Sequence, residues 1–340
     1  MPSARRTPPR DEQPSRNVVP EPSKDGEVVP EEIAPGIHRL ATDYPHVCGL
    51  PLWLHVIDAG SELVLLDAGI ASTPESSTAP ELAGLGLGLS DLTLVVNSHA
   101  HPDHMGGNAV LRKHSGARFA APALEAGWLE DNERLLTELW GSDPDALDLS
   151  ETERTELLEM LDERVRIDVL LRDGDRLPGE RPLQVITTSG HSPGHIAVLD
   201  ETSRTLFTFD DVQGRGRPYL GSSLWLAPLY TDVTRYTNGL TRLLELDFDA
   251  LVPSHGDAMD ATAGRRLIEE SIEWVAGVDE LTTGLLRSKG SLTVRDLADA
   301  VGTELGAYGG INLQTVRMAR AHLEHLARRG GAETRWHHRA

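Results

Sequence analysis

The strongest constraint on this chain is the stretch at residues 98–107, which reads SHAHPDHMGG. Three of the chain's 14 histidines lie here within six residues, together with one aspartate and two following glycines. His99 and His101 are two positions apart, so on an extended segment their side chains point to the same side. A turn through Pro102 then lets Asp103 and His104 face the same space. Because imidazole nitrogens and carboxylate oxygens suit zinc and similar divalent metals, the stretch predicts a metal site.

More candidate ligands stand at the ends of other predicted strands. From about residue 33 onward, short apolar runs with β-branched residues recur, among them WLHVID, ELVLLDAG, LQVITTSGH, TLFTFDD and ALVPSH. At the ends of such runs, beside glycine or at the switch from strand to loop, stand Asp67, His191, Asp210 and His255. With the first loop they give seven or more donors, too many for one tetrahedral ion. Two metals that share a bridging carboxylate are therefore expected.

The ordered set of motifs resembles that of the metallo-β-lactamase-fold hydrolase superfamily, over about residues 33–260. The motifs are Asp67, then His99-x-His101-x-Asp103-His104, then His191, Asp210 and His255. The resemblance implies an α/β fold, a four-layer αββα sandwich with helices outside two sheets. It also implies a metal-dependent hydrolase with a binuclear site.

Residue roles are implied by the same resemblance. The first metal would be held by His99, His101 and His191, the second by Asp103, His104 and His255, with Asp210 bridging the two. Asp67 would orient a ligand histidine or the loop. A hydroxide between the metals would be the nucleophile, since zinc lowers the pKa of bound water to about 7. Asp103 would help deliver a proton to the leaving group. We expect zinc, although manganese and iron suit the same ligands.

One position departs from the family pattern. The family usually has glycine before the bridging aspartate, whereas this chain has Phe209, and Asp211 follows Asp210 at once. If the strand end is shifted by one residue, Asp211 would be the bridging ligand. We favour Asp210 and keep Asp211 as the alternative.

The chain divides into three expected parts. Residues 1–32 carry many prolines and few large apolar side chains, so we expect a disordered tail. Residues 33–260 would form the catalytic domain, with a helical insert at about 122–180. Residues 121–170 hold fifteen Asp or Glu and four Arg, which fits either solvated helices or a lid over the site. Residues 261–340 show three helical segments and a short strand-like tail, an order of elements that is typical of a small winged-helix domain.

The composition of the chain argues against nucleic-acid and membrane partners. The formal net charge of −21 opposes non-specific phosphate binding. One cysteine, Cys48, excludes an internal disulfide. We find no apolar run near 18 residues and no signal-peptide core, so we expect a cytoplasmic protein without a membrane partner. A homodimer is left open.

The fold does not select the substrate, so three functions are compared. The favoured one is hydrolysis of an acyl thioester or ester, on a small-molecule substrate that is free or carrier-bound. The second is a metal-dependent ribonuclease or phosphodiesterase. A winged helix and six Arg against two Glu in residues 311–340 favour it, and the overall charge opposes it. The third is a non-catalytic binding module with a vestigial metal site.

Several aromatic residues and one more histidine are further candidates for the site. Tyr230 or Tyr236 could stabilise an oxyanion or simply pack in the core. An apolar pocket wall could include Trp128, Trp140 and Trp225. His195 is expected to pack or hydrogen-bond near a strand start rather than to touch metal.

Overall fold

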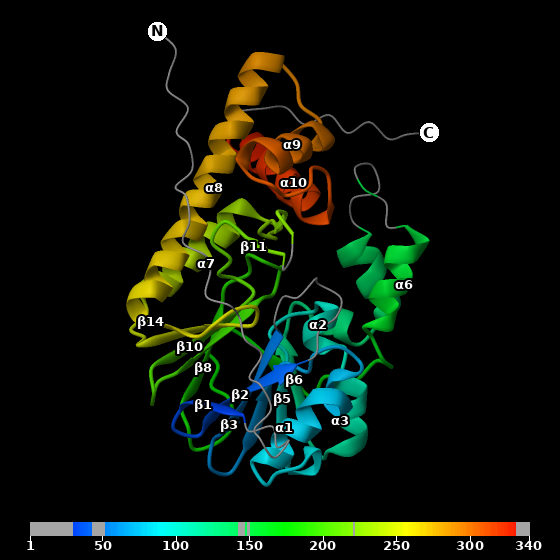
Figure 1. The fold of residues 1–340 in the computed structure, drawn as a ribbon, viewed down its shortest axis with the longest axis vertical. Coiled ribbons are helices and arrows are strands. Elements are labelled where there is room, and N and C mark those ends of the chain that lie inside the picture. Colours follow the sequence, from blue (N-terminus) through cyan, green and yellow to red (C-terminus); the bar gives the residue numbers. More distant parts are fainter. Residues whose placement is uncertain (1–29, 43–51, 142–146, 148–149, 220–221, 331–340) are drawn as a thin grey trace.

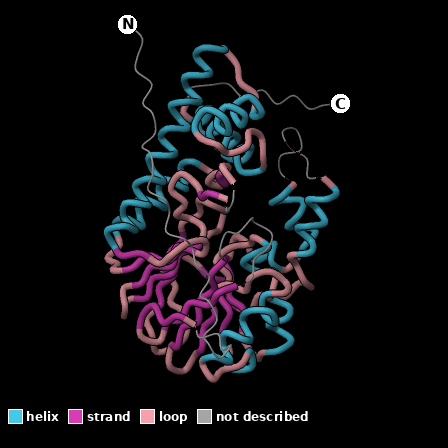
Figure 2. Tube along the Cα trace, viewed as in Figure 1, coloured by secondary structure: helices cyan, strands magenta, loops and turns pink. Residues whose placement is uncertain are grey.

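Two β-sheets form the centre of the fold (Figures 1 and 2). The computed structural model describes residues 30–42, 52–141, 147, 150–219 and 222–330. The first sheet holds seven strands in chain order: β1 (Glu31–Ala34), β2 (Ile37–Thr42), β3 (Leu52–Asp58), β4 (Leu63–Leu66), β5 (Leu94–Val96), β6 (Arg118–Pro122) and β7 (Val169–Leu171). The second has the order β14 (Met259–Asp260), β13 (Ala250–Pro253), β10 (Thr205–Phe209), β9 (Ile196–Asp200) and β8 (Leu183–Thr187).

The two sheets pack face to face over one apolar layer. Side chains of the first sheet such as Ile57 and Val96 share this layer with Val185 and Phe207 of the second. On β3 the neighbours Leu54 and Val56 point the other way, into a separate cluster under the helices. Because both faces of these strands are covered, their sequences are continuous apolar runs rather than alternating ones.

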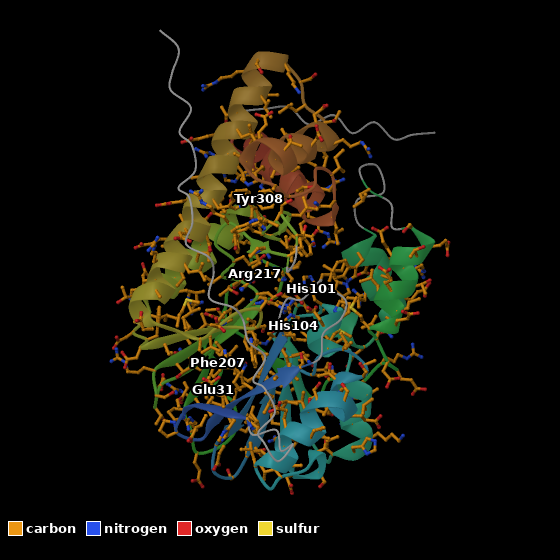
Figure 3. All side chains as sticks on the ribbon, viewed as in Figure 1. Glu31, His101, His104, Phe207, Arg217 and Tyr308 are labelled. Atoms are coloured by element: carbon orange, nitrogen blue, oxygen red, sulfur yellow. The ribbon has the colours of Figure 1, made fainter. Side chains whose placement is uncertain are left out.

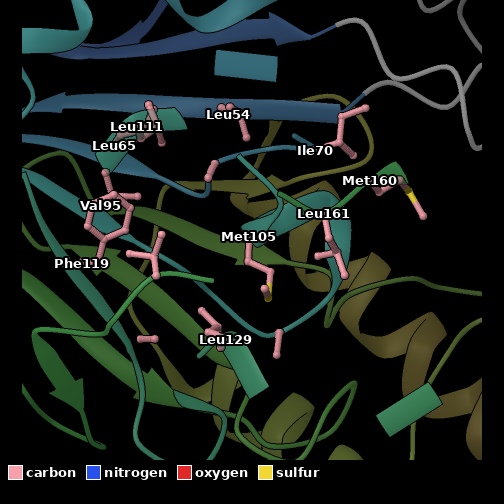
Figure 4. Close-up of a cluster of buried hydrophobic side chains, with 14 of the residues drawn as sticks. Leu54, Leu65, Ile70, Val95, Met105, Leu111, Phe119, Leu129, Met160 and Leu161 are labelled. Atoms are coloured by element: carbon pink, nitrogen blue, oxygen red, sulfur yellow. The ribbon is translucent and has the colours of Figure 1, made fainter. Parts of the chain in front are cut away.

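Helices cover the outer face of the first sheet. A helical turn, Pro74–Thr78, continues into α1 (Ala79–Gly84), and a short turn, Leu89–Asp91, precedes β5. After β5 come α2 (Pro102–Met105) and α3 (Asn108–His114). Leu54, Val95, Leu111 and Phe119 meet in the cluster between these helices and the sheet (Figure 4).

The predicted insert lies between β6 and β8. It contains α4 (Ala126–Leu129), α5 (Asn132–Arg134), a turn at Leu135–Trp140 and α6 (Glu151–Glu159), and it also supplies strand β7 to the first sheet. Ser150 caps α6 by accepting a hydrogen bond from the Glu153 amide. The segment after α6 is anchored in the fold, since Met160 and Leu161 belong to the cluster under the first sheet (Figure 4).

The outer face of the second sheet is covered by α7 (Val233–Glu245) and by the C-terminal helices. These are α8 (Ala261–Lys289), α9 (Val294–Ala300), a turn at Val301–Leu305 and α10 (Leu313–Arg328). Asp260 caps the start of α8, and Gly290 ends it with a positive φ of 76°. A small two-stranded sheet, β11 (Arg217–Pro218) and β12 (Trp225–Leu226), connects β10 to α7.

These layers confirm the predicted α/β sandwich with additional C-terminal helices. Residues 1–29 of the expected tail lie outside the described residues, and β1 begins at Glu31. The strand-like tail of the expected winged helix, and Cys48, also lie outside them. Among the described residues, no helix is both long and apolar enough to cross a membrane.

Candidate metal centre

The predicted ligands come from loops at one edge of the two sheets. Asp67 follows β4, His99 and His101 follow β5, and Asp103 and His104 lie in α2. The second sheet contributes the residues that follow β8, β10 and β13, namely His191, Asp210 and His255. Figure 3 shows His101 and His104 at this edge, between the sheets and the C-terminal helices.

These side chains form two neighbouring groups. His99, His101, His191 and Asp210 offer ligand atoms that lie within 4.8 Å of one another, and Asp103, His104 and His255 do the same. His101 Nδ1 is 2.9 Å from His191 Nε2 in the first group. His255 Nε2 is 3.2 Å from Asp103 Oδ2 in the second. This is the division into two sets that the sequence resemblance implied, apart from the bridging residue.

The Asp210 carboxylate lies between the two groups. Its Oδ2 atom is 3.7 Å from His191 Nε2 in the first group. The same atom is 3.4 Å from His104 Nε2 and 3.6 Å from His255 Nε2 in the second. One oxygen therefore faces histidine nitrogens of both groups, as a bridging carboxylate must.

Asp211, the alternative bridging residue, faces away from the centre. Its carboxylate lies 3.1 Å from His195 Nδ1 and accepts a hydrogen bond from the His191 amide at 3.2 Å. His195 is fully buried, and its Nε2 accepts a long hydrogen bond of 3.4 Å from the Asp210 amide. Asp211 and His195 thus support the backbone around Asp210 and His191, and the geometry favours Asp210 as the shared ligand.

Asp67 binds the loop and one histidine at once. Its Oδ1 accepts a hydrogen bond from the Ser98 amide at 2.7 Å, and its Oδ2 lies 2.8 Å from His104 Nδ1. The Ser98 hydroxyl donates to the same Oδ2 at 2.9 Å. This contact fixes the ring of His104 with Nε2 directed at Asp210, which is how a carboxylate orients a metal-ligating histidine.

Glu125 is a buried site residue that the sequence reasoning missed. One carboxylate oxygen accepts hydrogen bonds from the Ser192 hydroxyl at 2.5 Å and the Gly194 amide at 2.6 Å. The other accepts from the Ala100 amide at 2.7 Å. Glu125 therefore joins the loop of His99 and His101 to the loop of His191. It is a lone acid far from both loops in sequence, so no spacing signal marks it.

Burial and charge set the protonation of the centre. Burial lowers the pKa of His99 and His101 well below the usual value, and it lowers that of His191 to about 4. Burial has the same tendency at His104, but the Asp210, Asp103 and Asp67 charges outweigh it and raise its pKa. The first group thus presents neutral imidazoles, the form that binds metal.

Four polar atoms of the centre are buried without a hydrogen-bond partner among the described residues: His99 Nε2, His101 Nε2, His104 Nε2 and Asp210 Oδ1. Leaving such atoms unpaired costs free energy, so buried polar groups are nearly always satisfied. A divalent cation between the two groups would satisfy them. The donor set of nitrogens and carboxylate oxygens fits that cation chemically.

The loop backbones at this edge are strained. Phe209 has a φ of 47°, Asp67 of 63° and Ser189 of 53°, all in the left-handed region that favours glycine. Phe209 is the position where the family usually has glycine, so the chain keeps the backbone shape that glycine would allow. Strained residues of this kind are concentrated at functional sites.

Gly106 and Gly107 allow close packing of the backbone after the histidine motif. A Cβ on Gly106 would lie 2.0 Å from the carbonyl oxygen of Met160, and one on Gly107 would lie 2.4 Å from that of Ala68. The glycines let the start of α3 approach both the strand end at Asp67 and the end of the insert.

A pocket of about 170 Å³ opens beside the two groups. Its polar side includes His101, Asp103, Asp210 and His255, with Gln213 and Arg217. Its apolar lining residues are Trp140, Leu157 and Met160 of the insert, together with Leu226 and Leu229. Gln314 of α10 completes the lining. Figure 3 shows Arg217 above His101 and His104, toward the C-terminal helices.

The aromatic candidates divide between pocket and core. Trp140 lines the pocket, while Trp128 donates a hydrogen bond to Glu138 and Trp225 is 40% exposed on β12. Tyr230 and Tyr236 are buried and stacked 4.6 Å apart. Their hydroxyls are occupied, by His322 Nε2 at 2.7 Å and by the Asp211 carbonyl at 2.7 Å. Core packing is therefore their role in this structure.

Comparison of the sequence with known proteins gives related enzymes. Acyl-coenzyme A thioesterase MBLAC2 of Gallus gallus is 31% identical over 258 residues, which cover 73% of this chain and 84% of that protein. The Homo sapiens protein of the same name is 30% identical over 213 residues, 59% of this chain and 70% of that protein. A hydroxyacylglutathione hydrolase of Cereibacter sphaeroides is 26% identical over 151 residues, 44% of this chain and 45% of that protein.

Solved structures share the fold. A metallo-beta-lactamase family protein from Thermus thermophilus superimposes with a TM-score of 0.69 at 22% identity, covering 88% of this chain and 95% of that one. A beta-lactamase domain protein from Burkholderia ambifaria gives a TM-score of 0.59 at 22% identity, with 88% of both chains covered. The sequence profile of the metallo-beta-lactamase superfamily matches residues 52–255, the part that contains both candidate ligand groups. The chain therefore belongs to the metallo-β-lactamase superfamily and is a hydrolase of that fold.

Proposed function

We propose that this protein is a binuclear metal-dependent hydrolase that cleaves an acyl thioester. The observation that supports it best is the position of Asp210 Oδ2 between two histidine groups, 3.4 to 3.7 Å from nitrogens of each. The relatives named as acyl-coenzyme A thioesterases favour a thioester over other acyl bonds.

Two divalent ions suit this centre. The first would be held by His99, His101 and His191, the second by Asp103, His104 and His255, with Asp210 shared. Ions bound here would supply an activated water and polarise the substrate carbonyl. Zinc is the ion we propose, because the donors are mostly imidazole nitrogens.

The pocket chemistry supports an acyl substrate. Trp140, Leu157 and Met160 line the same pocket as the candidate ligands, so an acyl chain can lie on them while its carbonyl faces Asp210. Burial of each methylene on this wall contributes about 0.8 kcal/mol. Gln213 and Arg217 add hydrogen-bond donors at the polar side.

Asp103 and Asp67 have different roles: Asp103 transfers a proton, and Asp67 orients a ligand histidine. The Asp103 side chain is 15% exposed and lines the pocket, so its Oδ2 can take a proton from the attacking water and pass it to the leaving sulfur. Asp67 is buried and does not itself line the pocket. Its part is to hold His104 in one ring orientation.

Cleavage of RNA is the less favoured alternative. Nucleic-acid backbones are usually bound by clusters of Lys and Arg. Among the described residues, the pocket lining contains a single cation, Arg217. The cytoplasmic location, the homodimer and the winged-helix fold of the C-terminal part stay predictions.

A substrate panel tests the proposal. Purified protein, stripped with chelator and reloaded with zinc, manganese or iron, would be given a thioester, the oxygen ester of the same acyl group, a lactone, a β-lactam and a short RNA. We expect the thioester to be cleaved fastest, and only after metal is restored. The His101→Ala variant should lose about 100-fold or more of this activity.

The matched control is His114→Ala, because His114 is an exposed histidine on α3 that lies in neither ligand group. It should keep wild-type rates. Faster cleavage of RNA than of any acyl substrate would replace the proposed function by the alternative. Equal thioester rates in stripped and reloaded protein would overturn the metal-dependent mechanism.

A further inference from the structure

Arg317 connects the C-terminal helix α10 to the insert. Its side chain is buried, and its Nη2 donates a hydrogen bond to the carbonyl oxygen of Leu139. The guanidinium carbon lies 5.0 Å from the centre of the Trp140 ring. Leu139 and Trp140 end the helical turn of the insert, 178 and 177 residues before Arg317 in the chain. In Figure 1, α10 lies above the two sheets with the other C-terminal helices, and the insert helix α6 lies at the right.

This arginine is a buried cation that depends on those two partners. Among the described residues, no carboxylate forms an ion pair with Arg317, and burial lowers the pKa of its guanidinium to about 10. A cation without a carboxylate is costly inside a protein unless dipoles or an aromatic face compensate it. The Leu139 carbonyl and the face of Trp140 are the compensating groups, so the arginine and the end of the turn hold each other in place.

Trp140 in turn borders the candidate metal centre. Its ring centre is 5.0 Å from that of His101, and it lines the pocket beside Leu157 and Met160. Gln314, one helical turn before Arg317 on α10, lines the same pocket. Trp140, an apolar wall residue of the pocket, is therefore contacted from α10, a helix outside the sandwich itself.

We propose that Arg317 is a positioning residue that fixes the Trp140 wall and so determines which acyl chains the pocket accepts. This inference rests on the proposed thioesterase function. Without the guanidinium, the hydrogen bond from Arg317 to the Leu139 carbonyl is lost and the Trp140 ring loses the cation that packs on it. A chain long enough to reach Trp140 then meets a wall that is no longer fixed, while a short acyl group does not reach it.

The test measures kcat and KM for acetyl, butyryl, hexanoyl and octanoyl thioesters of one thiol. Wild type, Arg317→Met and Arg317→Lys are compared with Arg328→Met. Arg328 is the matched control, an exposed α10 arginine that pairs with Asp232 of α7 at 3.1 Å, away from the insert. For Arg317→Met we expect KM to rise about fivefold or more for the longest chain that wild type prefers, with acetyl constants within about twofold.

Arg317→Lys keeps a cation near the carbonyl and the ring, so it should restore part of the wild-type profile. Trp140→Phe should shift the profile in the same direction as Arg317→Met, and the two changes together should add little. Thermal melting of each variant confirms that it is folded, and Arg317→Lys with Trp140→Phe keeps the test informative if Arg317→Met does not fold.

Two failures are distinguishable. If wild type cleaves thioesters but the chain-length profile is the same in Arg317→Met, Arg317→Lys and Trp140→Phe, the positioning role is wrong and the thioesterase function stands. An equal loss for all chain lengths in Arg317→Met also overturns it, since that is the result of general damage. If wild type cleaves no thioester, the proposed function fails first. Calorimetry then measures the binding of non-cleavable thioether analogues of the same chain lengths. The positioning role of Arg317 is decided by comparing the chain-length dependence of binding between wild type and the same variants.

Discussion

Asp67 Oδ2 lies 2.8 Å from His104 Nδ1, and both side chains are buried. Because this contact leaves His104 Nε2 free to face Asp210, Asp67→Ala should weaken binding of the second ion by about 10- to 100-fold. The affinity can be measured by titrating zinc into stripped protein. Asp58→Asn, an exposed aspartate at the end of β3, is the control and should bind both ions normally. Unchanged affinity in Asp67→Ala would contradict the orienting role.

Glu125 is predicted to stabilise the two ligand loops together. In Glu125→Gln one acceptor oxygen becomes an amide donor, which cannot accept from Ser192 and Gly194 or from Ala100 on that side. The free energy of unfolding should fall by about 2–3 kcal/mol, measured by denaturant titration of metal-free protein. A variant as stable as wild type would show that these three hydrogen bonds do not hold the loops.

Phe209 combines a buried ring with a backbone that glycine prefers. Its φ is 47°, and its side chain packs between the sheets. Phe209→Ala and Phe209→Gly should both lose about 3–5 kcal/mol through the cavity they leave. Phe209→Gly should nevertheless be the more stable of the two by about 1 kcal/mol, because only glycine relieves the left-handed strain. If Phe209→Ala were instead more stable than Phe209→Gly, the backbone at this position would not be strained in solution.

Glu81 predicts a pH dependence of stability. It is 4% exposed under the first sheet, and burial raises its pKa from 4.5 to about 7 although the Ala41 amide donates to it. The folded state binds this proton more tightly than the unfolded chain. Protonation of Glu81 therefore contributes fully to the free energy of unfolding below pH 4.5, and this contribution is lost as the pH rises to about 7. The loss is on the order of 2–3 kcal/mol.

The Glu81→Gln variant should lack this part of the pH dependence and be more stable than wild type above pH 7. Denaturant titrations of both proteins at about pH 5, 6, 7 and 8 measure the difference in their free energy of unfolding. Parallel curves for the two proteins would show that Glu81 ionises in the folded state at its ordinary pKa.

Much of the centre could be predicted from the sequence, because each candidate ligand follows an apolar strand at one edge of the sheets. Asp67, His191 and His255 stand at such ends, where the period of the strands and the following glycine are visible in the sequence. The sequence favours Asp210 but keeps Asp211 open, since a shift of one residue reverses which side chain faces the centre; in the structure the Asp210 carboxylate lies between the two histidine groups.

Residues that act across long sequence separations were not predictable. Glu125 joins two loops, and Arg317 reaches Trp140 from α10, but neither lies in a motif or a periodic pattern. Tyr230 and Tyr236 stood near the site in sequence, yet stacking against each other places them in the core. Such outcomes depend on tertiary packing, which a single sequence does not reveal.

The most direct test of the account is the metal content of the purified protein by elemental analysis. Wild type and His114→Ala should carry about two ions per chain, and Asp211→Asn should keep them. Asp210→Ala should lose at least one ion, because its carboxylate is shared by both groups. No bound metal in wild type after exposure to zinc, manganese and iron, or loss of ions in Asp211→Asn but not in Asp210→Ala, would contradict the binuclear centre described here.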